Sequence, residues 1–281
     1  MGIIPWRPFS RMPMHQTTWI LQDIPYNPSP SIVTLERVVL EAGYRLVKTP
    51  VVPFSDRMPD IPDDIPLPIV IYGMNTMIQT TSRHPKWRHG LFFEPEKFEP
   101  AAYTQALGDR MLNSDAQLLT CEELAESGLS PTEKFFLRPN DDSKTFTGQV
   151  MDFREFWRWY HQEPGDEEYV DLHPDMRVLY STPKTIKAEY RTFILDRKVI
   201  ALTQYLPEAR LLASPEVIEF AEDIAARYAP SEAFVCDIAA TNEGWKVIEF
   251  NCINGSGFYL ANVDAIVRSL SAWQEHRVTE A

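Results

Sequence analysis

The stretch 233–259, AFVCDIAATNEGWKVIEFNCINGSGFY, constrains the fold of this chain more than any other. Apolar and polar residues alternate on both sides of a turn at 242–244, which predicts two antiparallel strands followed by a polar loop that contains glycine. Residues two apart on a strand share a face, so Glu249 and Asn251 point the same way. The predicted hairpin therefore presents a carboxylate and an amide side by side.

The length of the turn decides which way Asp237 points. A three-residue loop, with Gly244 in the left-handed conformation, places Asp237 opposite Glu249, whereas a two-residue loop places it on the other face. We favour the three-residue loop. Two facing carboxylates repel each other, and a divalent cation would remove that conflict; two carboxylates and an amide oxygen suit Mg²⁺. The alternative is that both acids lie on the solvated face of an edge hairpin, and the spacing alone leaves the two interpretations open.

Composition narrows the class of protein. The chain has 281 residues, enough for about two domains, and 44% of them are hydrophobic. Its formal net charge of −13 disfavours a nucleic-acid-binding module, which needs clustered Lys and Arg. No long apolar run or export signal is recognisable, so we expect no membrane insertion and a cytoplasmic location. Three cysteines without metal-ligand spacing predict neither a zinc site nor a disulfide framework: Cys121, Cys236 and Cys252.

The first half of the chain predicts an α/β unit. Residues 1–13 show no periodicity and are expected to form a flexible extension. A strand, a helix that begins at Ser31 and a second strand come next, and the apolar run PIVIYG predicts a buried parallel strand that ends in a loop able to contact a ligand. The first strand, the helix and the second strand are expected at 18–21, 31–41 and 44–53, and the buried strand and its loop at 68–73 and 74–79. A further strand is expected at 90–93, and helices are expected at 99–107 and 121–127.

The second half is richer in strand pairs. A strand at 133–138 leads into the polar loop 139–148, whose lysine, Lys144, is flanked by hydroxyl side chains suited to wrapping phosphate oxygens, although the Walker A spacing is absent. The hairpin 186–206 carries Arg191 and Glu189 on one face. Arg191 is suited to a bidentate phosphate contact and Glu189 to bracing it or accepting from a ribose hydroxyl; a weak cross-strand ion pair is the alternative.

These motifs, taken together, resemble the ATP-grasp superfamily. The segments FLRPNDDSKTFTG, EYRTFIL and DIA…GWKVIEFNCINGSGFY are similar to the arginine-for-lysine clade of bacteria and phages, in which an arginine replaces the nucleotide-binding lysine. The resemblance implies an α/β pre-ATP-grasp domain at 14–114 and an α+β ATP-grasp domain with mixed or antiparallel sheets at 115–281. Subdomains at 115–183 and 184–281 would hold ATP between them.

The resemblance also implies site residues. Arg138 would reach the α- and β-phosphates, Lys144 would cover them, and Glu189 would bind ribose or brace the site. Arg191 would contact the γ-phosphate or an acyl phosphate. Arg191 and Lys144 are the candidate catalytic residues. Adenine would dock against the segment from Ser181 to Lys184. One or two Mg²⁺ ions would be bound by Asp237, Glu249 and Asn251. The acceptor substrate would lie near Asn254, Gly255, Ser256 and Gly257.

The implied activity is that of an ATP-dependent ligase. A small-molecule or peptide carboxylate would attack ATP to give an acyl phosphate and ADP, and an amine or another nucleophile would then displace phosphate. The alternatives are a small-molecule kinase on the same fold and a protein that binds nucleotide without turnover. The substrates are not readable from the sequence, and the oligomeric state is left open, a homodimer included.

Overall fold

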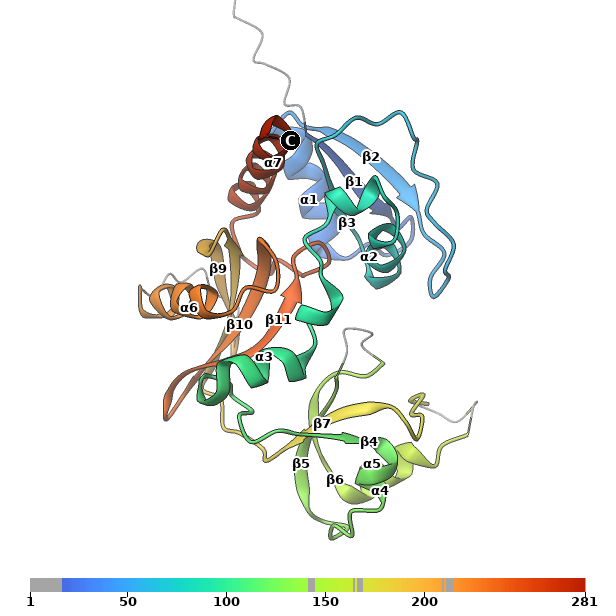
Figure 1. The fold of residues 1–281 in the computed structure, drawn as a ribbon, viewed down its shortest axis with the longest axis vertical. Coiled ribbons are helices and arrows are strands. Elements are labelled where there is room, and N and C mark those ends of the chain that lie inside the picture. Colours follow the sequence, from blue (N-terminus) through green and yellow to red (C-terminus); the bar gives the residue numbers. More distant parts are fainter. Residues whose placement is uncertain are drawn as a thin grey trace, which may run out of the picture. The chain divides into compact units, whose positions relative to one another are not determined.

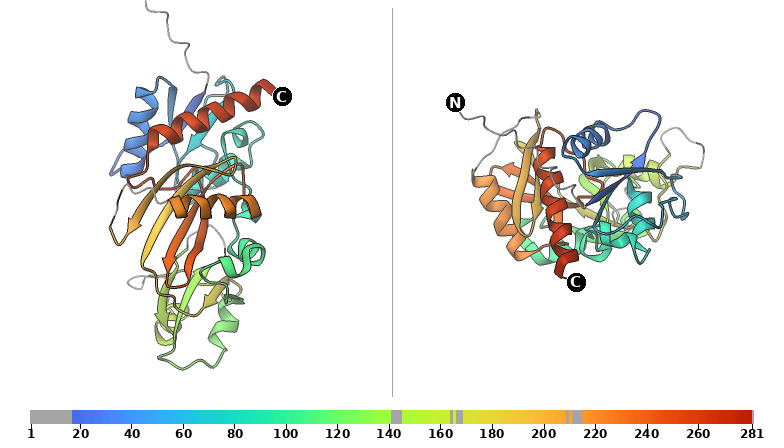
Figure 2. Two further views of the ribbon diagram at one scale, coloured as in Figure 1. Left: turned by 90° about the vertical axis from the view of Figure 1, so that its left-hand side faces the viewer. Right: turned by 90° about the horizontal axis from the view of Figure 1, so that it is seen from above.

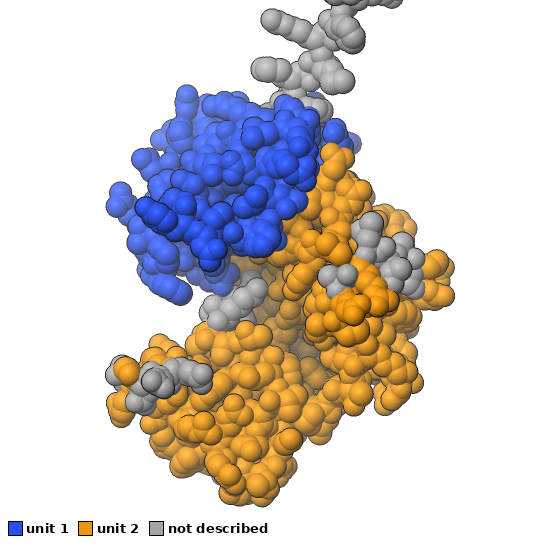
Figure 3. Space-filling model, turned by 180° about the vertical axis from the view of Figure 1, so that it is seen from behind, with its two compact units in different colours: residues 1–90, 267–281 blue, residues 91–266 orange. Residues whose placement is uncertain are grey.

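The structure, a computed structural model, describes residues 17–140, 145–163, 165, 169–208, 210 and 215–280. The chain divides into two compact units, shown in different colours in Figure 3. Unit 1 comprises residues 1–90 and 267–281, and unit 2 comprises residues 91–266. Unit 1 is therefore built from two distant segments, whereas unit 2 is continuous. No helix in the described part of the chain is long and apolar enough to span a lipid bilayer.

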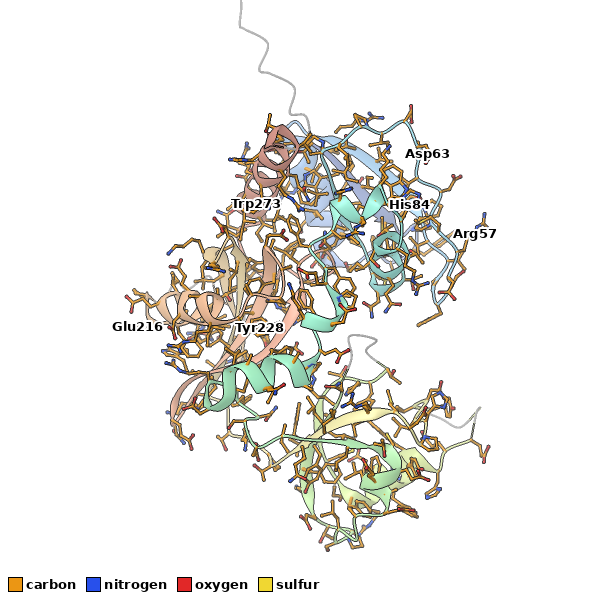
Figure 4. The ribbon with its side chains drawn as sticks, viewed as in Figure 1. Arg57, Asp63, His84, Glu216, Tyr228 and Trp273 are labelled. Atoms are coloured by element: carbon orange, nitrogen blue, oxygen red, sulfur yellow. The ribbon has the colours of Figure 1, made fainter. Side chains whose placement is uncertain are left out.

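Unit 1 contains a parallel three-stranded sheet in the order β2-β1-β3. The central strand, β1, is buried along nearly its whole length, which suits the three consecutive apolar residues at its centre, Trp19, Ile20 and Leu21. In Figure 1, α1 and α7 cover one face of this sheet and α2 the other. The elements are β1 (Thr18–Asp23), α1 (Pro30–Glu41), β2 (Arg45–Pro50), β3 (Ile69–Tyr72), α2 (Asn75–Ser82) and η1 (Trp87–Gly90). Figure 4 labels His84, which precedes η1 and stacks on Trp87, the first residue of η1.

The last helix, α7 (Val263–Glu280), contributes its residues from 267 onward to unit 1. The indole Nε1 of Trp19 on β1 donates to Ser271 Oγ over 3.0 Å, although the two residues are 252 positions apart in sequence. Thr17 Oγ1 donates to Glu275 Oε1 over 2.9 Å. Polar contacts therefore fix α7 on the first strand of the sheet.

Unit 2 contains two four-stranded sheets, both fully antiparallel. The first has the order β11-β10-β8-β9, and α6 lies across it in Figure 2 (left). Its strands and helix are β8 (Ala188–Leu195), β9 (Lys198–Leu206), α6 (Pro215–Arg227), β10 (Ala233–Thr241) and β11 (Gly244–Cys252). The preceding chain forms η2 (Pro95–Lys97), α3 (Pro100–Leu107) and η3 (Gly108–Arg110). Tyr228, labelled in Figure 4, follows α6 and packs on Phe250.

The second sheet of unit 2 has the order β4-β7-β5-β6. It is covered by the amphipathic α5, whose aromatic residues join an apolar core centred on Phe135 and Phe156. Asp152 caps α5, because its Oδ1 accepts from Glu155 N over 2.9 Å. The elements are β4 (Gln117–Thr120), α4 (Cys121–Ala125), β5 (Lys134–Pro139), β6 (Gln149–Asp152), α5 (Phe153–Tyr160) and β7 (Arg177–Ser181).

The predicted hairpin forms, but its turn differs from the prediction. Asp237 lies opposite Glu249, as expected. The predicted three-residue loop is wrong, since Thr241 pairs directly with Gly244 and only two residues lie between them. A register shift at Ile248 then supplies the extra residue, and this bulge returns Asp237 to the face of Glu249. The correct facing therefore depends on a bulge inside the strand rather than on the turn.

Several local predictions need correction. The helix α1 begins after Ser29 rather than at Ser31, because Ser29 Oγ accepts from Ile32 N and Pro30 occupies the first helical position. The expected loop 74–79 is mostly helix α2, and the apolar segment 90–93 forms no strand. The predicted extension 1–13 lies outside the described residues. The division at 14–114, 115–183 and 184–281 stays a prediction; each of the latter two segments contains one of the sheets of unit 2.

Candidate functional site

Three neighbouring strands of unit 2 bring one arginine and two carboxylates into line. Arg191 on β8 pairs in register with Asp237 on β10, and Asp237 pairs with Glu249 on β11. Residues directly opposite on adjacent strands have side chains on the same face. The sheet therefore presents a row of three charged groups: guanidinium, carboxylate, carboxylate.

Hydrogen bonds connect this row to two further side chains. Arg191 holds Asp237 with two bonds, Nε to Oδ1 at 2.9 Å and Nη2 to Oδ2 at 2.7 Å. Asn251 Nδ2 donates to Asp237 Oδ2 over 3.2 Å and to Glu249 Oε1 over 2.9 Å. From the other sheet, Arg138 Nη2 lies 3.0 Å from Glu249 Oε2. We call these five residues the arginine–carboxylate network.

Burial makes this network unlike a solvated sheet face. The Asp237 side chain is 2% exposed, and burial, together with the carboxylates of Glu249 and Glu189, raises its pKa to about 6 against the lowering effect of Arg191. Burial also lowers the pKa of Arg191, but the Asp237 carboxylate outweighs it, so that pKa lies above its usual value. Burying a carboxylate costs free energy, so it does not by itself stabilise a fold. Residues whose pKa is shifted by burial and by a neighbouring charge are often found in functional sites. The alternative of ordinary solvated acids is therefore wrong for Asp237.

A cavity of about 370 Å³ in unit 2 adjoins the network. Its volume lies in the usual range for small-molecule sites, about 300 to 1,000 Å³. Both charged and apolar side chains line it, and a nucleotide with phosphates and a base would need both kinds. The charged residues are Arg138, Lys184, Glu189 and Glu249, and the apolar ones include Leu112, Phe136, Ile186 and Ile248.

A family model for an ATP-grasp domain, the third family of the arginine-for-lysine clade, matches residues 64–270, well over half of the chain. The chain belongs to this family. Solved structures share the ATP-grasp fold at low sequence identity. ATP-grasp ligase PsnB with a minimal precursor, Mg and ADP has a TM-score of 0.56 at 12% identity, covering 93% of this chain and 99% of that one.

Two other ATP-grasp structures agree. The RimK domain protein from Sphaerobacter thermophilus has a TM-score of 0.57 at 11% identity, covering 92% of this chain and 99% of that one. D-alanine–D-alanine ligase from Bacillus anthracis has a TM-score of 0.53 at 12% identity, covering 94% and 98%. No curated protein sequence is detectably similar to the chain. The predicted superfamily, clade and fold class are thus confirmed.

Whether the ATP-grasp site fits Mg²⁺ can be judged from its donors. No group of three or more His, Cys, Asp and Glu side chains among the described residues could hold a metal ion. The network offers two carboxylates, which are hard oxygen donors, and the amide of Asn251, which here turns its Nδ2 toward both carboxylates and would turn its oxygen toward a bound ion. Mg²⁺ commonly takes one or two carboxylates and fills its shell with water and phosphate. Burial is the main reason that the pKa of Asp237 is raised, and a cation would relieve the repulsion by Glu249 and Glu189 that adds to it. The residues present therefore fit Mg²⁺ bound together with a nucleotide.

The two residues predicted to lie near adenine differ in their surroundings. Lys184 lines the 370 Å³ cavity, and its Nζ lies 2.8 Å from Asp115 Oδ1. The Ser181 side chain is buried instead, and its Oγ has no hydrogen-bond partner among the described residues. Ser181 lines a separate small cavity of about 10 Å³ next to Arg138. Lys184 can thus touch a ligand in the main cavity, whereas Ser181 is not among the residues that line it.

The loop after β11 holds its own shape with the side chains that the sequence singled out. Asn254 is buried, and its Oδ1 accepts from Phe92 N over 2.8 Å. Ser256 is buried as well, and its Oγ donates to Cys252 O over 2.7 Å. Gly255 is exposed. Their proximity to an acceptor substrate stays a prediction, with backbone rather than side-chain contact favoured by this geometry.

Sequence reasoning missed an aromatic pair around Arg191. The rings of Tyr205 and Tyr259 stack at 4.9 Å and 7°, and Arg191 Cζ lies 5.1 Å from the Tyr259 ring centre. Arg191 Nη1 also donates to Gly257 O over 3.1 Å. Burial raises the pKa of Tyr205, and its hydrogen bond with Glu189 adds to that shift. No local pattern indicates this pair, because one tyrosine is on β9 and the other follows β11.

Lys144 lies outside the described residues, so its predicted contact with phosphate stays a prediction. Of the polar loop 139–148 that contains it, residues 139, 140 and 145–148 are described. Asn140 is buried, and its Oδ1 accepts from Ala101 N over 3.0 Å. At the other end of the loop, Thr147 and Gly148 line the 370 Å³ cavity.

Proposed function

We propose that the chain is an ATP-dependent ligase that joins a carboxylate to an amine or another nucleophile through an acyl phosphate. The observation that carries this proposal is the arginine–carboxylate network, of which Arg138 and Glu249 line the cavity. A ligase of this kind needs cationic groups where phosphate charge develops and acidic groups that hold a metal ion. The network supplies both within hydrogen-bonding distance of each other.

Each residue of the network has a proposed role. Arg138 contacts the α- and β-phosphates, since it lines the cavity and its planar guanidinium can bind two oxygens at once. Arg191 contacts the γ-phosphate and then the acyl phosphate, and Glu189 binds the ribose or braces Tyr205. Asp237, Glu249 and Asn251 hold Mg²⁺, which when bound neutralises charge on the phosphate oxygens. Lys144 is proposed to cover the phosphates.

The reaction consists of two displacements. An oxygen of the substrate carboxylate attacks the γ-phosphorus, the bond to the bridging oxygen breaks, and ADP leaves. The nitrogen of the acceptor then attacks the acyl carbon, phosphate leaves, and the acceptor loses a proton. The substrate is proposed to be a small-molecule or peptide carboxylate, since similar structures include ligases for a precursor peptide and for D-alanine.

Calorimetry tests the nucleotide and metal site. Wild type is expected to bind ATP with a clear dependence on Mg²⁺, and Glu249→Gln is expected to lose that dependence because a carboxylate ligand becomes a neutral amide. Glu222→Gln is the matched control, since Glu222 also pairs with a cation but lies outside the cavity. An unchanged Mg²⁺ dependence in Glu249→Gln would remove Glu249 from the metal site. Wild type that binds no nucleotide would overturn the proposal.

Product analysis tests the chemistry. ADP release is screened over carboxylates, amino acids and peptides, with hydroxylamine added to trap an acyl phosphate as the hydroxamate. Ligation requires a second nucleophile and releases phosphate. A stable phosphorylated product that forms without a nucleophile and yields no hydroxamate would instead identify a kinase on the same fold.

A further inference from the structure

Asp115 makes an unusual set of contacts for a partly exposed acid. It lies in the turn between η3 and β4, and its Oδ2 accepts from both Thr182 N, at 3.1 Å, and Thr182 Oγ1, at 2.5 Å. Its Oδ1 lies 2.8 Å from Lys184 Nζ. One carboxylate thus binds a backbone amide, a hydroxyl and an ammonium of the same short segment.

That segment, 182–187, joins β7 of one sheet to β8 of the other and contains no regular secondary structure. Its conformation is therefore not fixed by a strand or helix ladder. Two of its residues, Lys184 and Ile186, line the 370 Å³ cavity, and so do Leu112 and Asn113 from the turn that carries Asp115. Asp115 connects two parts of the cavity wall through a segment that has no regular secondary structure.

Packing does not explain this residue. The Asp115 side chain is 37% exposed, so it contributes little apolar burial. A surface ion pair by itself contributes only about 0 to 1 kcal/mol to stability. Its three contacts converge on a single segment, and what they determine is the shape of that segment and the direction of the Lys184 side chain.

We propose that Asp115 is a positioning residue of the nucleotide pocket, which holds 182–184 in shape and directs the Lys184 ammonium into the cavity. This inference rests on the proposed function, in which the cavity binds ATP. An ammonium has three N–H groups, and Lys184 uses two of them on Asp115 and Thr182. The third remains for the ligand. Because Asp115 balances its charge, Lys184 is suited to a neutral acceptor such as a nitrogen of the base.

The test is Asp115→Asn, which keeps the size of the side chain but replaces one acceptor with a donor. The amide must then present N–H groups either to Thr182 or to Lys184, so one set of contacts is lost. We expect the Kd for MgATP to rise at least tenfold, while kcat at saturating ATP stays within twofold of wild type. A role in positioning the base predicts this split, because phosphoryl transfer takes place elsewhere in the site.

Glu222→Gln is again the matched control. Glu222 accepts from a backbone amide, Val199 N at 3.2 Å, and from Lys198 Nζ at 2.7 Å, which is the same chemistry away from the cavity. The Glu222→Gln variant is expected to bind ATP with the same Kd as wild type. Its melting temperature is expected to change by about as much as that of Asp115→Asn. This comparison separates a defect of the pocket from a general loss of stability.

A second variant shows whether Asp115 acts through Lys184. In a Lys184→Met background, Asp115→Asn should raise the Kd by less than it does alone, since part of its effect has already been removed. The inference is overturned if Asp115→Asn binds ATP as wild type does, if kcat falls with an unchanged Kd, or if the two substitutions act independently. In each case wild type still binds ATP and the proposed function stands; loss of ATP binding in wild type would overturn both.

Discussion

Replacing Arg191 with methionine should destabilise unit 2 strongly. Arg191 makes two hydrogen bonds to Asp237, whose side chain is 2% exposed, so the substitution leaves a buried carboxylate without its cation. Removing one partner of a buried ion pair typically costs about 3 to 5 kcal/mol. Methionine has a similar length and fills much of the space, so the loss of charge dominates over the loss of volume.

Protonation limits the cost. Without Arg191, Asp237 can take up a proton, which at pH 7 costs about 1.4 kcal/mol for each of the roughly three pH units above the ordinary aspartate value of 3.8. The upper limit is therefore roughly 4 kcal/mol, and we expect about 3 to 4 kcal/mol. A raised pKa means that the folded state binds the extra proton, so stability falls as pH rises. The deficit of Arg191→Met should accordingly shrink when the pH is lowered from 8 to 5.

Urea denaturation in the presence of a chelator measures this free energy of unfolding directly. The double variant Arg191→Met/Asp237→Asn removes the orphaned charge and should recover a substantial part of the stability. Lys198→Met is the control, because Lys198 pairs with Glu222 but its side chain is 73% exposed, and its effect should stay below about 1 kcal/mol.

The reasoning is refuted by any of three results. A loss below about 1 kcal/mol in Arg191→Met would mean that Asp237 is not held by this guanidinium. Additive effects of the two substitutions would show that they do not interact. A deficit that grows as the pH falls would have the wrong sign for a carboxyl that takes up a proton on folding.

Further predictions address other parts of unit 2. Thiol reagents should react with the cysteines only after unfolding, as measured by labelling in urea, because all three are buried: Cys121, Cys236 and Cys252. Gly148→Ala should weaken ATP binding in calorimetry, since its Cβ would lie 2.9 Å from Phe136 Cζ at the cavity wall. Asp152→Ala should cost about 1 kcal/mol in urea denaturation through loss of the α5 cap. Burial favours a higher pKa for Asp115, but hydrogen bonds from Lys184 and Thr182 outweigh it and lower that pKa to about 2. The stabilising contacts of Asp115 should therefore persist from about pH 8 down to about pH 4 and be lost only on further acidification, as followed by comparing wild type with Asp115→Asn.

Features encoded by short periodic patterns could be predicted from the sequence. Alternation identified β10 and β11 and put Glu249 and Asn251 on one face, which their hydrogen bond confirms. The same alternation placed Arg191 and Glu189 on one face of β8. Several such patterns in the same order along the chain were enough to identify the ATP-grasp fold.

Features set by tertiary contact could not be predicted. The bulge at Ile248 has no local signal, because Ile248 is a regular strand residue by composition and pattern. Asp115 and Thr182 are 67 residues apart, and only the fold reveals that they meet. Tyr259, which stacks on Tyr205, also has a φ of 49°, a conformation that nothing in its own sequence indicates.

The contact between β1 and α7 has a consequence for synthesis on the ribosome. The first strand of unit 1 meets its helical partner only after about 250 further residues have been made, since Trp19 binds Ser271. At roughly 5 to 20 residues per second, that interval lasts on the order of 10 to 50 seconds. Unit 2 ends at residue 266, just before Ser271, so its last residues are also made only near the end of that interval. Nascent chains that stop before residue 266 should therefore lack the complete form of both units and stay sensitive to protease.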